Sequence, residues 1–514
     1  MTTKVSGIYD HIEISKDNMQ IPVFKSGKFM ESKYSPSNEA KRIIASLEKS
    51  YSAFLILGCG SGSLINEIIN VNKDALIIAV ETSEEDINFI NSFTLIQKLK
   101  ANKNIIFTTI QKLYETLINN YFPAKYGDLK IIEQKAWILE NQNLVKDISE
   151  IIQHSLNIIS ADYSVQAHFG KIWVHNILSN ISSLQKFPQN IKQDFPLPDT
   201  SKIAAVIAAG PSLDKTLSLI ESQRDKYFII CTDTAFQSLT RRKIQSDIVV
   251  SIDAQNISSF HFFPVEKIQN TLFAFDLCAS SSAASRILEK EGNVRFFVSG
   301  HPLASFINNS EDSIFPNVYS GSGTVTISAV SIAKNLGFSN VQIFGADFSY
   351  HEGKPYTKGT YLENQFLHKS NKIISQENSF SRLMYRTNLE EISKQKYTNQ
   401  ILSAYKSSLE DFIKKENSSF RIENDIYKIK FSDAENFKNE SKNFNLYKPQ
   451  KIKKSTAEIL NLIENSQEQI KELIYLPLIA ALRNNVTLRN NEINSDKLYN
   501  ELKNLAHSFF LSYN

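Results

Sequence analysis

Short apolar runs that end in glycine, serine or an acid alternate along this chain with longer stretches of helical periodicity. Ala53–Leu57 runs into the glycine turn Gly58–Gly62, and Ile203–Ala209 runs into Gly210. Strands that are apolar on both faces are typical of parallel sheets, which helices cover on each side. The pattern therefore predicts an α/β protein built from doubly wound parallel sheets.

The expected strands fall into two groups. The first group comprises 53–57, 75–81, 104–110 and 129–132, and it is followed by a helix predicted over 143–185. The second group comprises Ala204–Ala208, Tyr227–Thr232, Ile248–Ile252, Thr271–Phe275, Val294–Val298 and Val341–Phe344. Between the groups, the proline-containing segment 187–200 is predicted to be a linker.

From about residue 375 the chain becomes rich in Lys, Asn, Ser and Glu. Helices are predicted there at Asn388–Glu416, Ala457–Ile474 and Asp496–Ser508, with one strand at Ile426–Phe431. Three domains are expected: a Rossmann-like domain over 1–190, a central catalytic domain over 191–385 and a mainly helical domain over 386–514.

Length and composition limit the classes of function. A chain of 514 residues predicts two to four domains. A net charge of +3 gives no case for a nucleic-acid partner, and the apolar runs are too short to span a bilayer. The first residues lack the apolar region of a signal peptide, and the three cysteines lack metal-ligand spacing. A cytoplasmic protein with no bound metal and no tightly bound cofactor is expected.

The first glycine turn has two interpretations. Gly58–Gly62 after a strand, with Glu81 ending the next strand, fits a nucleotide-binding crossover in which the acid binds ribose hydroxyls. The turn resembles the first motif of S-adenosylmethionine methyltransferases, but no catalytic tetrapeptide of that class follows Ile131. The alternative is a tight turn that binds no ligand.

The central group of strands carries the stronger chemical pattern. Gly210-Pro-Ser212 follows its first strand, and the Ser/Gly/Thr-rich segment Ser320–Thr326 opens a helix, where free N–H groups suit an anion. The last strand delivers Asp347, Tyr350 and Tyr356 to its carboxyl end, where open α/β sheets bind ligands. Together these segments predict a site for an activated, phosphate-bearing donor.

These segments resemble the motility-associated factor (Maf) family of flagellin glycosyltransferases, whose core is shared with bacterial sialyltransferases that use CMP-sugars. The resemblance rests on Ala208–Asp214, Ser320–Gly337 and Gly345–Asp347 and extends over about residues 20 to 380. The N-terminal run Lys25–Ala40 also looks like the opening of Maf proteins.

The resemblance implies roles for individual residues. It places these residues against the nucleotide: Gly210, Pro211, Ser212, Thr232, Asp233, Gly321, Ser322, Gly323 and Thr324. Tyr350, Gly353 and Tyr356 reproduce the Tyr-x-x-Gly-x-x-Tyr spacing that holds the departing phosphate, one residue further from Asp347 than in the related enzymes. His368 is the first positional candidate for the general base and His351 the second.

The expected function is therefore transfer of a nonulosonic sugar of the pseudaminic, legionaminic or sialic type from CMP to Ser or Thr of flagellin. Phenol hydroxyls would stabilise the phosphate that leaves, and a histidine would activate the acceptor. Two alternatives stay open: a kinase similar to 6-hydroxymethylpterin diphosphokinases, which needs ATP and magnesium, and a flagellin-binding accessory protein without catalysis. The outer domains are expected to bind the acceptor.

Overall fold

The computed structural model describes residues 7–187, 195–263, 268, 270–321, 323–416, 418–432, 444–487 and 495–513. The chain divides into two compact units, one of residues 1–171 with 468–512 and the other of residues 172–467 with 513–514. The predicted boundaries at 190 and 385 differ from this division. Half of the predicted linker, residues 188–194, lies outside the described residues.

The first unit is a parallel sheet wrapped by short helices. Its strands have the order β5-β4-β3-β6 and are all parallel, and a separate antiparallel hairpin, β1-β2, precedes them. Its elements are β1 (Tyr9–Ile14), β2 (Gln20–Phe24), α1 (Pro36–Ala45), β3 (Ala53–Leu57), α2 (Ser63–Val71), β4 (Leu76–Glu81), α3 (Glu84–Ile90), α4 (Thr94–Leu99), β5 (Ile105–Thr109), α5 (Leu113–Asn120), α6 (Pro123–Tyr126), β6 (Leu129–Glu133), α7 (Lys135–Glu140), α19 (Glu468–Thr487) and α20 (Ser495–Leu511).

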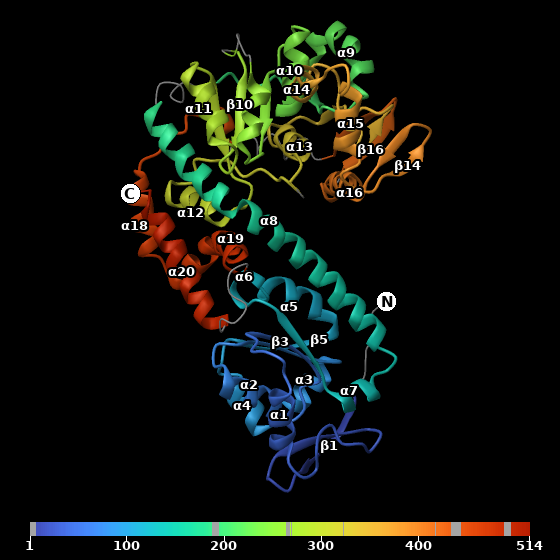
Figure 1. The fold of residues 1–514 in the computed structure, drawn as a ribbon, viewed down its shortest axis with the longest axis vertical. Helices are drawn as coiled ribbons and strands as arrows, with labels where there is room; N and C mark the ends of the chain where they lie inside the picture. Colours follow the sequence, from blue (N-terminus) through green and yellow to red (C-terminus); the bar gives the residue numbers. More distant parts are fainter. Residues whose placement is uncertain are drawn as a thin grey trace. The chain divides into compact units, whose positions relative to one another are not determined.

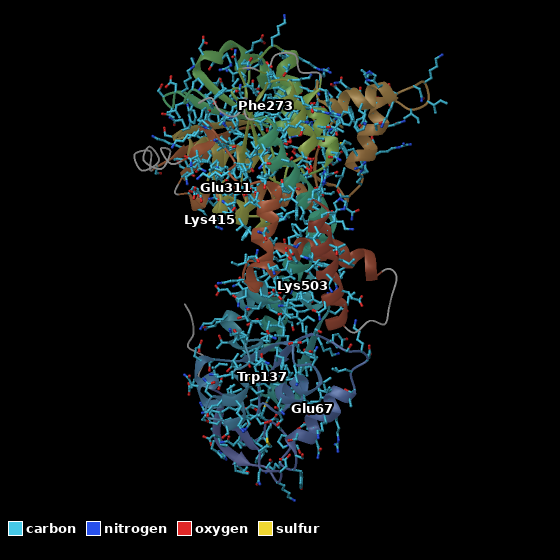
Figure 2. The ribbon with its side chains drawn as sticks, turned by 90° about the vertical axis from the view of Figure 1, so that its left-hand side faces the viewer. Glu67, Trp137, Phe273, Glu311, Lys415 and Lys503 are labelled. Atoms are coloured by element: carbon cyan, nitrogen blue, oxygen red, sulfur yellow. The ribbon has the colours of Figure 1, made fainter. Side chains whose placement is uncertain are left out.

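Apolar residues on both faces of β3 and β4 build the core of this unit, and Trp137 is completely buried within it (Figure 2). The C-terminal helices α19 and α20 belong here: Lys125 of α6 pairs with Glu472 of α19 at 2.9 Å. The helix α8 (Val145–Lys186) contributes residues to both units.

The second unit contains an eight-stranded sheet in the order β11-β10-β9-β8-β7-β12-β17-β16 (Figure 1). The six strands from β11 to β12 are parallel, and β17 and β16 are antiparallel. Its elements are β7 (Ile203–Ile207), α9 (Leu213–Ser222), β8 (Tyr227–Thr232), α10 (Asp233–Arg241), β9 (Ile248–Ser251), the 3-10 helix η4 (Asn256–Phe262), β10 (Leu272–Asp276), α11 (Ser281–Glu289), β11 (Asn293–Phe297), α12 (Pro302–Ser310), α13 (Val325–Asn335), β12 (Asn340–Phe344), β13 (Tyr350–His351), α14 (Tyr361–Lys369), α15 (Gln376–Met384), β14 (Glu390–Ser393), β15 (Lys396–Thr398), α16 (Gln400–Lys415), β16 (Ser418–Glu423), β17 (Ile426–Phe431) and α18 (Thr456–Glu464).

The α/β prediction with parallel sheets is confirmed, and all six central strands form. The region after residue 385 departs from the prediction. Residues 390–398 form the hairpin β14-β15 in place of the first half of a helix, with a turn at Gln395, whose φ is +59°. The predicted strand Ile426–Phe431 forms as β17 and pairs with β12, so this segment extends the central sheet.

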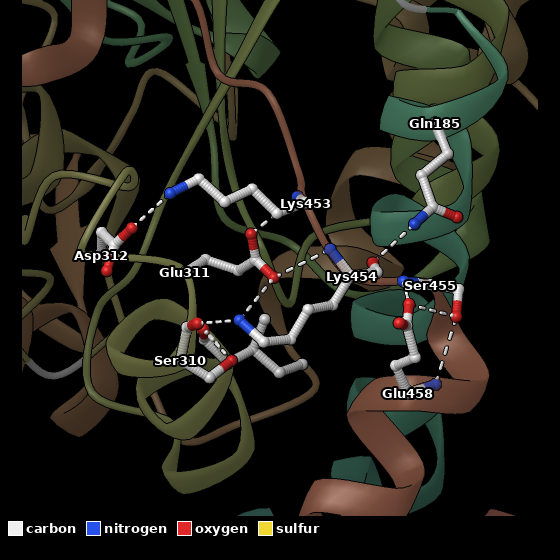
Figure 3. Close-up of polar contacts among 9 residues, drawn as sticks. Gln185, Ser310, Glu311, Asp312, Lys453, Lys454, Ser455 and Glu458 are labelled. Carbon is white, nitrogen blue, oxygen red and sulfur yellow. Dashed lines mark hydrogen bonds and ion pairs between the residues drawn. The ribbon is translucent and has the colours of Figure 1, made fainter.

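A polar network holds the C-terminal segment of the second unit against its body (Figure 3). Glu311, which is fully buried, accepts hydrogen bonds from the backbone N–H groups of Lys453 at 2.7 Å and Lys454 at 3.1 Å. Ser455 and Glu458 then form a capping box that starts α18. Nearby, the Gln450 side chain bonds both the N–H and the C=O of Phe296 and so closes the outer edge of β11.

Across the described ranges, the helices are all too short or too polar to cross a bilayer.

Candidate functional site

The strand order of the second unit places a switch point between β7 and β12. The chain leaves β7 toward β8 on one side and returns on the other side through β12. Parallel sheets bind ligands at the carboxyl ends of the strands that flank such a point. The Gly210-Pro-Ser212 turn follows β7, and Asp347 follows β12, so the two predicted segments meet there.

Backbone and side-chain contacts fix this meeting closely. Gly210 N–H donates to Gly345 O at 2.8 Å, and Ser212 N–H donates to Asp347 Oδ2 at 2.9 Å. A Cβ on Gly210 would lie 2.3 Å from Asp347 Oδ2, so only glycine fits. Thr357 N–H donates to Ala209 O at 2.9 Å and draws the segment after the tyrosine pair over the same turn.

A row of buried polar atoms without a partner crosses this edge of the sheet. The strands β10, β9, β8, β7 and β12 are consecutive neighbours. Each of them, or the connection that follows it, carries at least one such atom. Within the described residues, the atoms that lack a hydrogen-bond partner include Asp276 Oδ2, His261 Nδ1, Thr232 Oγ1, Ser212 Oγ and Asp347 Oδ1. Buried polar groups are almost always paired, and so this row has the character of a ligand-binding edge.

Asp233 and Thr232 lie at the carboxyl end of β8, as predicted. Asp233 is buried, and its carboxylate accepts from Thr234 N at 2.6 Å and from Ser251 Oγ at 2.7 Å. Thr232 occupies the N-cap of α10 and makes no cap bond with its side chain. The Thr232 hydroxyl is therefore buried and has no hydrogen-bond partner among the described residues.

The Ser320–Thr324 turn stands at the start of α13, as predicted. Gly321 and Gly323 have φ values of +56° and +86°, and Thr324 is the N-cap residue. Since α13 precedes the parallel strand β12 and packs on β7, β8 and β9, its N-terminus lies at the carboxyl edge of the sheet. A Cβ on Gly321 would lie 3.0 Å from Ser408 Oγ of α16. Ser322 lies outside the described residues.

The predicted tyrosine pair comes together with Asp233. Burial raises the pKa of Tyr356 to about 12, and the nearby Tyr350, Tyr361 and Asp233 add to the rise. Burial likewise raises the pKa of Tyr350, whose phenol bonds Asn399. Both phenols therefore keep their protons at pH 7 and can donate hydrogen bonds.

The two candidate histidines contact other parts of the second unit. His351 follows Tyr350 in β13, so the two side chains point to opposite faces of the strand. His351 Nε2 lies 3.0 Å from Ser349 Oγ and 3.8 Å from Asp347 Oδ1. His368 lies on the exposed side of α14, and its Nδ1 bonds Asn364 O at 2.7 Å. Its role as the base stays a prediction.

Sequence reasoning missed two residues, His261 near Tyr361 and Tyr405 near Tyr356. His261 lies in η4, and its ring meets the Tyr361 ring at 4.5 Å. Tyr405 of α16 is close enough to Tyr356 to contribute to its raised pKa. The helix α16 therefore borders the site, although the segment after 385 was expected to serve only the acceptor. The one signal in the sequence that could have pointed to His261 is its place after the third central strand, at the ligand-binding edge of the sheet.

Part of α8 supports the loops at this edge. Asn176 Nδ2 donates to Ala254 O at 2.9 Å and to Cys278 O at 3.1 Å, and Asn180 Nδ2 donates to Leu277 O at 3.0 Å. These carbonyls follow β9 and β10, so α8 holds the ends of two strands in place. The part of the chain that the structure describes contains no group of three or more His, Cys, Asp or Glu arranged for a metal.

The glycine turn of the first unit is occupied by the protein itself. Ser61 N–H donates at 2.7 Å to the half-buried Glu31 carboxylate, which takes the place of an anionic ligand. A Cβ on Gly58 would lie 2.6 Å from both Met30 and Trp137.

Glu81, the last residue of β4, also forms hydrogen bonds within the protein. It accepts from Cys59 N at 2.7 Å, Trp137 Nε1 at 2.9 Å and Tyr9 OH at 3.0 Å. The features that suggested a nucleotide site here serve close packing instead.

Comparisons with known proteins agree with the fold. Residues 175–353 match the family model described as 6-hydroxymethylpterin diphosphokinase MptE-like. The solved Maf glycosyltransferase of Magnetospirillum magneticum AMB-1 is similar with a TM-score of 0.54 and 11% identity, over 99% of this chain and 87% of that chain. The chain thus has the fold of that glycosyltransferase around an MptE-like core.

Sequence relatives add no activity. Two uncharacterized proteins of Treponema pallidum (strain Nichols) are 36% identical over 138 residues and 37% identical over 139 residues, which is 27% and 26% of this chain. The chain spans 64% and 49% of the lengths of these two relatives.

Proposed function

We propose that this protein is a glycosyltransferase that moves a nonulosonic sugar from a CMP donor to Ser or Thr residues of flagellin, and that it acts in the cytoplasm in support of flagellar assembly and motility. The donor is a substrate and not a resident cofactor. The likeness in fold to a Maf glycosyltransferase supports the reaction class. The donor and the acceptor come from the sequence resemblance.

The observation that carries the proposal is the row of unpartnered polar atoms across five neighbouring strands. The polar atoms belong to neighbouring strands, which lie about 4.8 Å apart, and a nucleotide sugar offers hydroxyls and phosphate oxygens along its length. Ser212 Oγ and Thr232 Oγ1 can donate to phosphate oxygens, and Asp347 Oδ1 can accept from a hydroxyl. Asp347 is acceptor-only when ionised, so its place beside the turn suits a sugar hydroxyl better than a phosphate.

The tyrosine pair supports the chemical step. When the sugar leaves CMP, negative charge develops on the phosphate, and two protonated phenols lower the energy of that charge by hydrogen bonding. Tyr350 is positioned by Asn399, which itself caps α16 through Leu402 N–H at 2.9 Å. A phenol held in this way is preorganised for the departing group.

The general base is proposed to be a histidine, with His368 the first candidate. Its exposed place on α14 would bring it to the acceptor only when a bound protein covers that helix. Replacing His368, His351 and His261 one at a time by Asn and recording transfer against pH separates them. Loss of the acidic limb of the profile in one variant identifies the base.

A second candidate function is a kinase of the pterin diphosphokinase type, because the matching family model has that description. A third is an accessory protein that binds flagellin without catalysis. Calorimetry on the full chain separates the three. CMP binding without ATP binding supports transfer, ATP binding that needs magnesium supports the kinase, and binding of neither supports the accessory role.

Acceptor binding is proposed for the first unit and the C-terminal helices. Leu473 on α19 and Leu505 on α20 are 50% and 48% exposed, as expected of helices that contact another protein. Changing both to Lys should weaken flagellin retention and leave CMP affinity unchanged. Leu219→Lys on α9, where the leucine is 37% exposed, is the matched control.

A further inference from the structure

An aromatic cluster borders the row of polar atoms on the β9 side. Phe260 and His261 come from η4, and Tyr361 opens α14 about 100 residues later. The Phe260 and Tyr361 rings are stacked with centroids 6.1 Å apart and planes at 23°. The His261 ring stands edge-on to Tyr361 at 4.5 Å and 84°. Two distant segments thus build one group of rings.

The cluster is partly exposed, at the ring of Phe260. Phe260 is 50% exposed, whereas His261 is only 7% exposed. Despite this burial, His261 Nδ1 has no hydrogen-bond partner among the described residues. Burial lowers the pKa of His261, so the ring is neutral at pH 7, and Nδ1 can accept a hydrogen bond in one tautomer.

Two carboxylates act electrostatically on Tyr361. Asp253 follows β9, and Asp233 follows β8. Burial is the largest cause of the raised pKa of Tyr361, and the charges of these two carboxylates raise it further. Asp233 also contributes to the raised pKa of Tyr356, which connects the cluster to the proposed phosphate site. A group bound against the rings would therefore meet negative charge, which favours hydrogen-bond donors such as an exocyclic amine.

A stacking ring, an acceptor nitrogen and neighbouring carboxylates match a planar heterocycle that carries an amine. Stacking on an aromatic side chain tolerates any base, whereas the acceptors distinguish an amine from a carbonyl at the same position. We propose that Phe260, His261 and Tyr361 form the nucleobase subsite, which selects cytosine over uracil. This inference rests on the proposed function and assigns the base-reading residues of the same site.

The test is calorimetry on the full chain with CMP, UMP and AMP as probes. The wild type is expected to bind CMP at least tenfold more tightly than UMP. Phe260→Ala should weaken CMP binding about tenfold, the scale of one lost stacking partner. His261→Phe should bring the affinities for CMP and UMP within about threefold. Tyr385→Ala is the matched control, because Tyr385 lies at the C-terminal end of α15 and is 67% exposed.

The outcomes separate the two levels of inference. No CMP binding by the wild type overturns the proposed function and this subsite with it. Normal CMP binding that Phe260→Ala and His261→Phe both leave unchanged overturns the subsite and leaves the proposed function standing. Tighter binding of AMP than of CMP overturns the assignment to cytosine and favours the kinase. Thermal unfolding of each variant confirms that it is folded.

Discussion

The Asp347 carboxylate accepts a hydrogen bond from the Ser212 backbone N–H at 2.9 Å, across 135 residues of sequence. This bond joins the ends of β7 and β12 at the switch point of the central sheet. The second carboxylate oxygen of Asp347, Oδ1, is buried and has no hydrogen-bond partner among the described residues. One oxygen of this carboxylate thus shapes the turn, and the other lies 3.8 Å from His351 Nε2.

Replacing Asp347 should affect both roles. Asp347→Asn loses a charge-assisted bond to Ser212, and we expect the free energy of unfolding to fall by about 1–3 kcal/mol. CMP affinity should fall at least tenfold. Asp425→Asn is the control, because Asp425 is half-exposed and its partner Lys396 is 3.6 Å away, and it should cost under about 0.5 kcal/mol. Equal effects of the two variants would contradict a special role for Asp347.

Gly210 should tolerate no side chain. A Cβ there would lie 2.3 Å from Asp347 Oδ2 and 2.5 Å from Gly345 O, so Gly210→Ala must push the turn away from β12. We expect a loss of about 1–3 kcal/mol in stability, as for other overpacked sites, and CMP binding too weak to measure. Chemical denaturation and calorimetry check this. An alanine variant with wild-type CMP affinity would show that the turn does not contact the nucleotide.

Tyr356 is expected to act in the chemical step. Tyr356→Phe removes one hydrogen-bond donor from the leaving phosphate, and sugar transfer should slow by about 10- to 1000-fold with the fold intact. Tyr385→Phe, at an exposed position, should keep the wild-type rate. The readout is the mass of flagellin after timed incubation with the donor. Undiminished glycosylation by the Tyr356 variant would remove this phenol from the mechanism.

The first unit should lose stability as pH rises through neutrality. Burial raises the pKa of both Glu31 and Glu81 to about 7 in the folded protein. A folded-state pKa above the unfolded value near 4.5 means that the protonated form stabilises the fold. This stability is fully present below pH 4.5 and is lost as pH rises through about 7, at up to about 1.4 kcal/mol per pH unit for each carboxyl.

The Glu31→Gln variant tests this dependence. Gln keeps an oxygen for Ser61 N–H but does not titrate, so the slope of melting temperature against pH between 5 and 8 should decrease. Glu48→Gln, at an exposed position, should keep the wild-type slope. Melting curves are to be read by tryptophan fluorescence in a Trp173→Phe background, so that the signal comes from Trp137 alone. A slope unchanged by Glu31→Gln would mean that Glu31 is ionised throughout this range.

Glu311 should be the most sensitive point of the C-terminal attachment (Figure 3). Glu311→Ala leaves the N–H groups of Lys453 and Lys454 without their acceptor, and we expect a loss of about 2–4 kcal/mol. The neighbouring Asp312 pairs with Lys453 in solvent, with 76% of its side chain exposed, and Asp312→Ala should cost under about 0.5 kcal/mol. Proteolysis after residue 444 measures detachment. Similar protection in both variants would contradict the role of Glu311.

Much of the fold could be predicted from the sequence because the signals are local. Runs such as Ile203–Ile207 are apolar at successive positions, as expected of a strand that helices cover on both faces. Each run ends at a glycine or polar turn. The positions of Gly210, Asp347 and Tyr356 followed from the same logic, since parallel strands bring their carboxyl ends to one edge. The strand at Ile426–Phe431 was also readable as an isolated apolar alternation.

Long-range pairing decided the rest, and a local pattern carries no information about it. The sequence by itself determined the class of fold, the strands and the turn residues of the candidate site. Only the tertiary structure set β17 beside β12, brought Tyr405 toward Tyr356 and placed His261 against Tyr361. The tertiary structure also packs Met30 against Gly58 and brings the Glu31 carboxylate to Ser61 N–H. An internal carboxylate satisfies an N–H group as well as a ligand does.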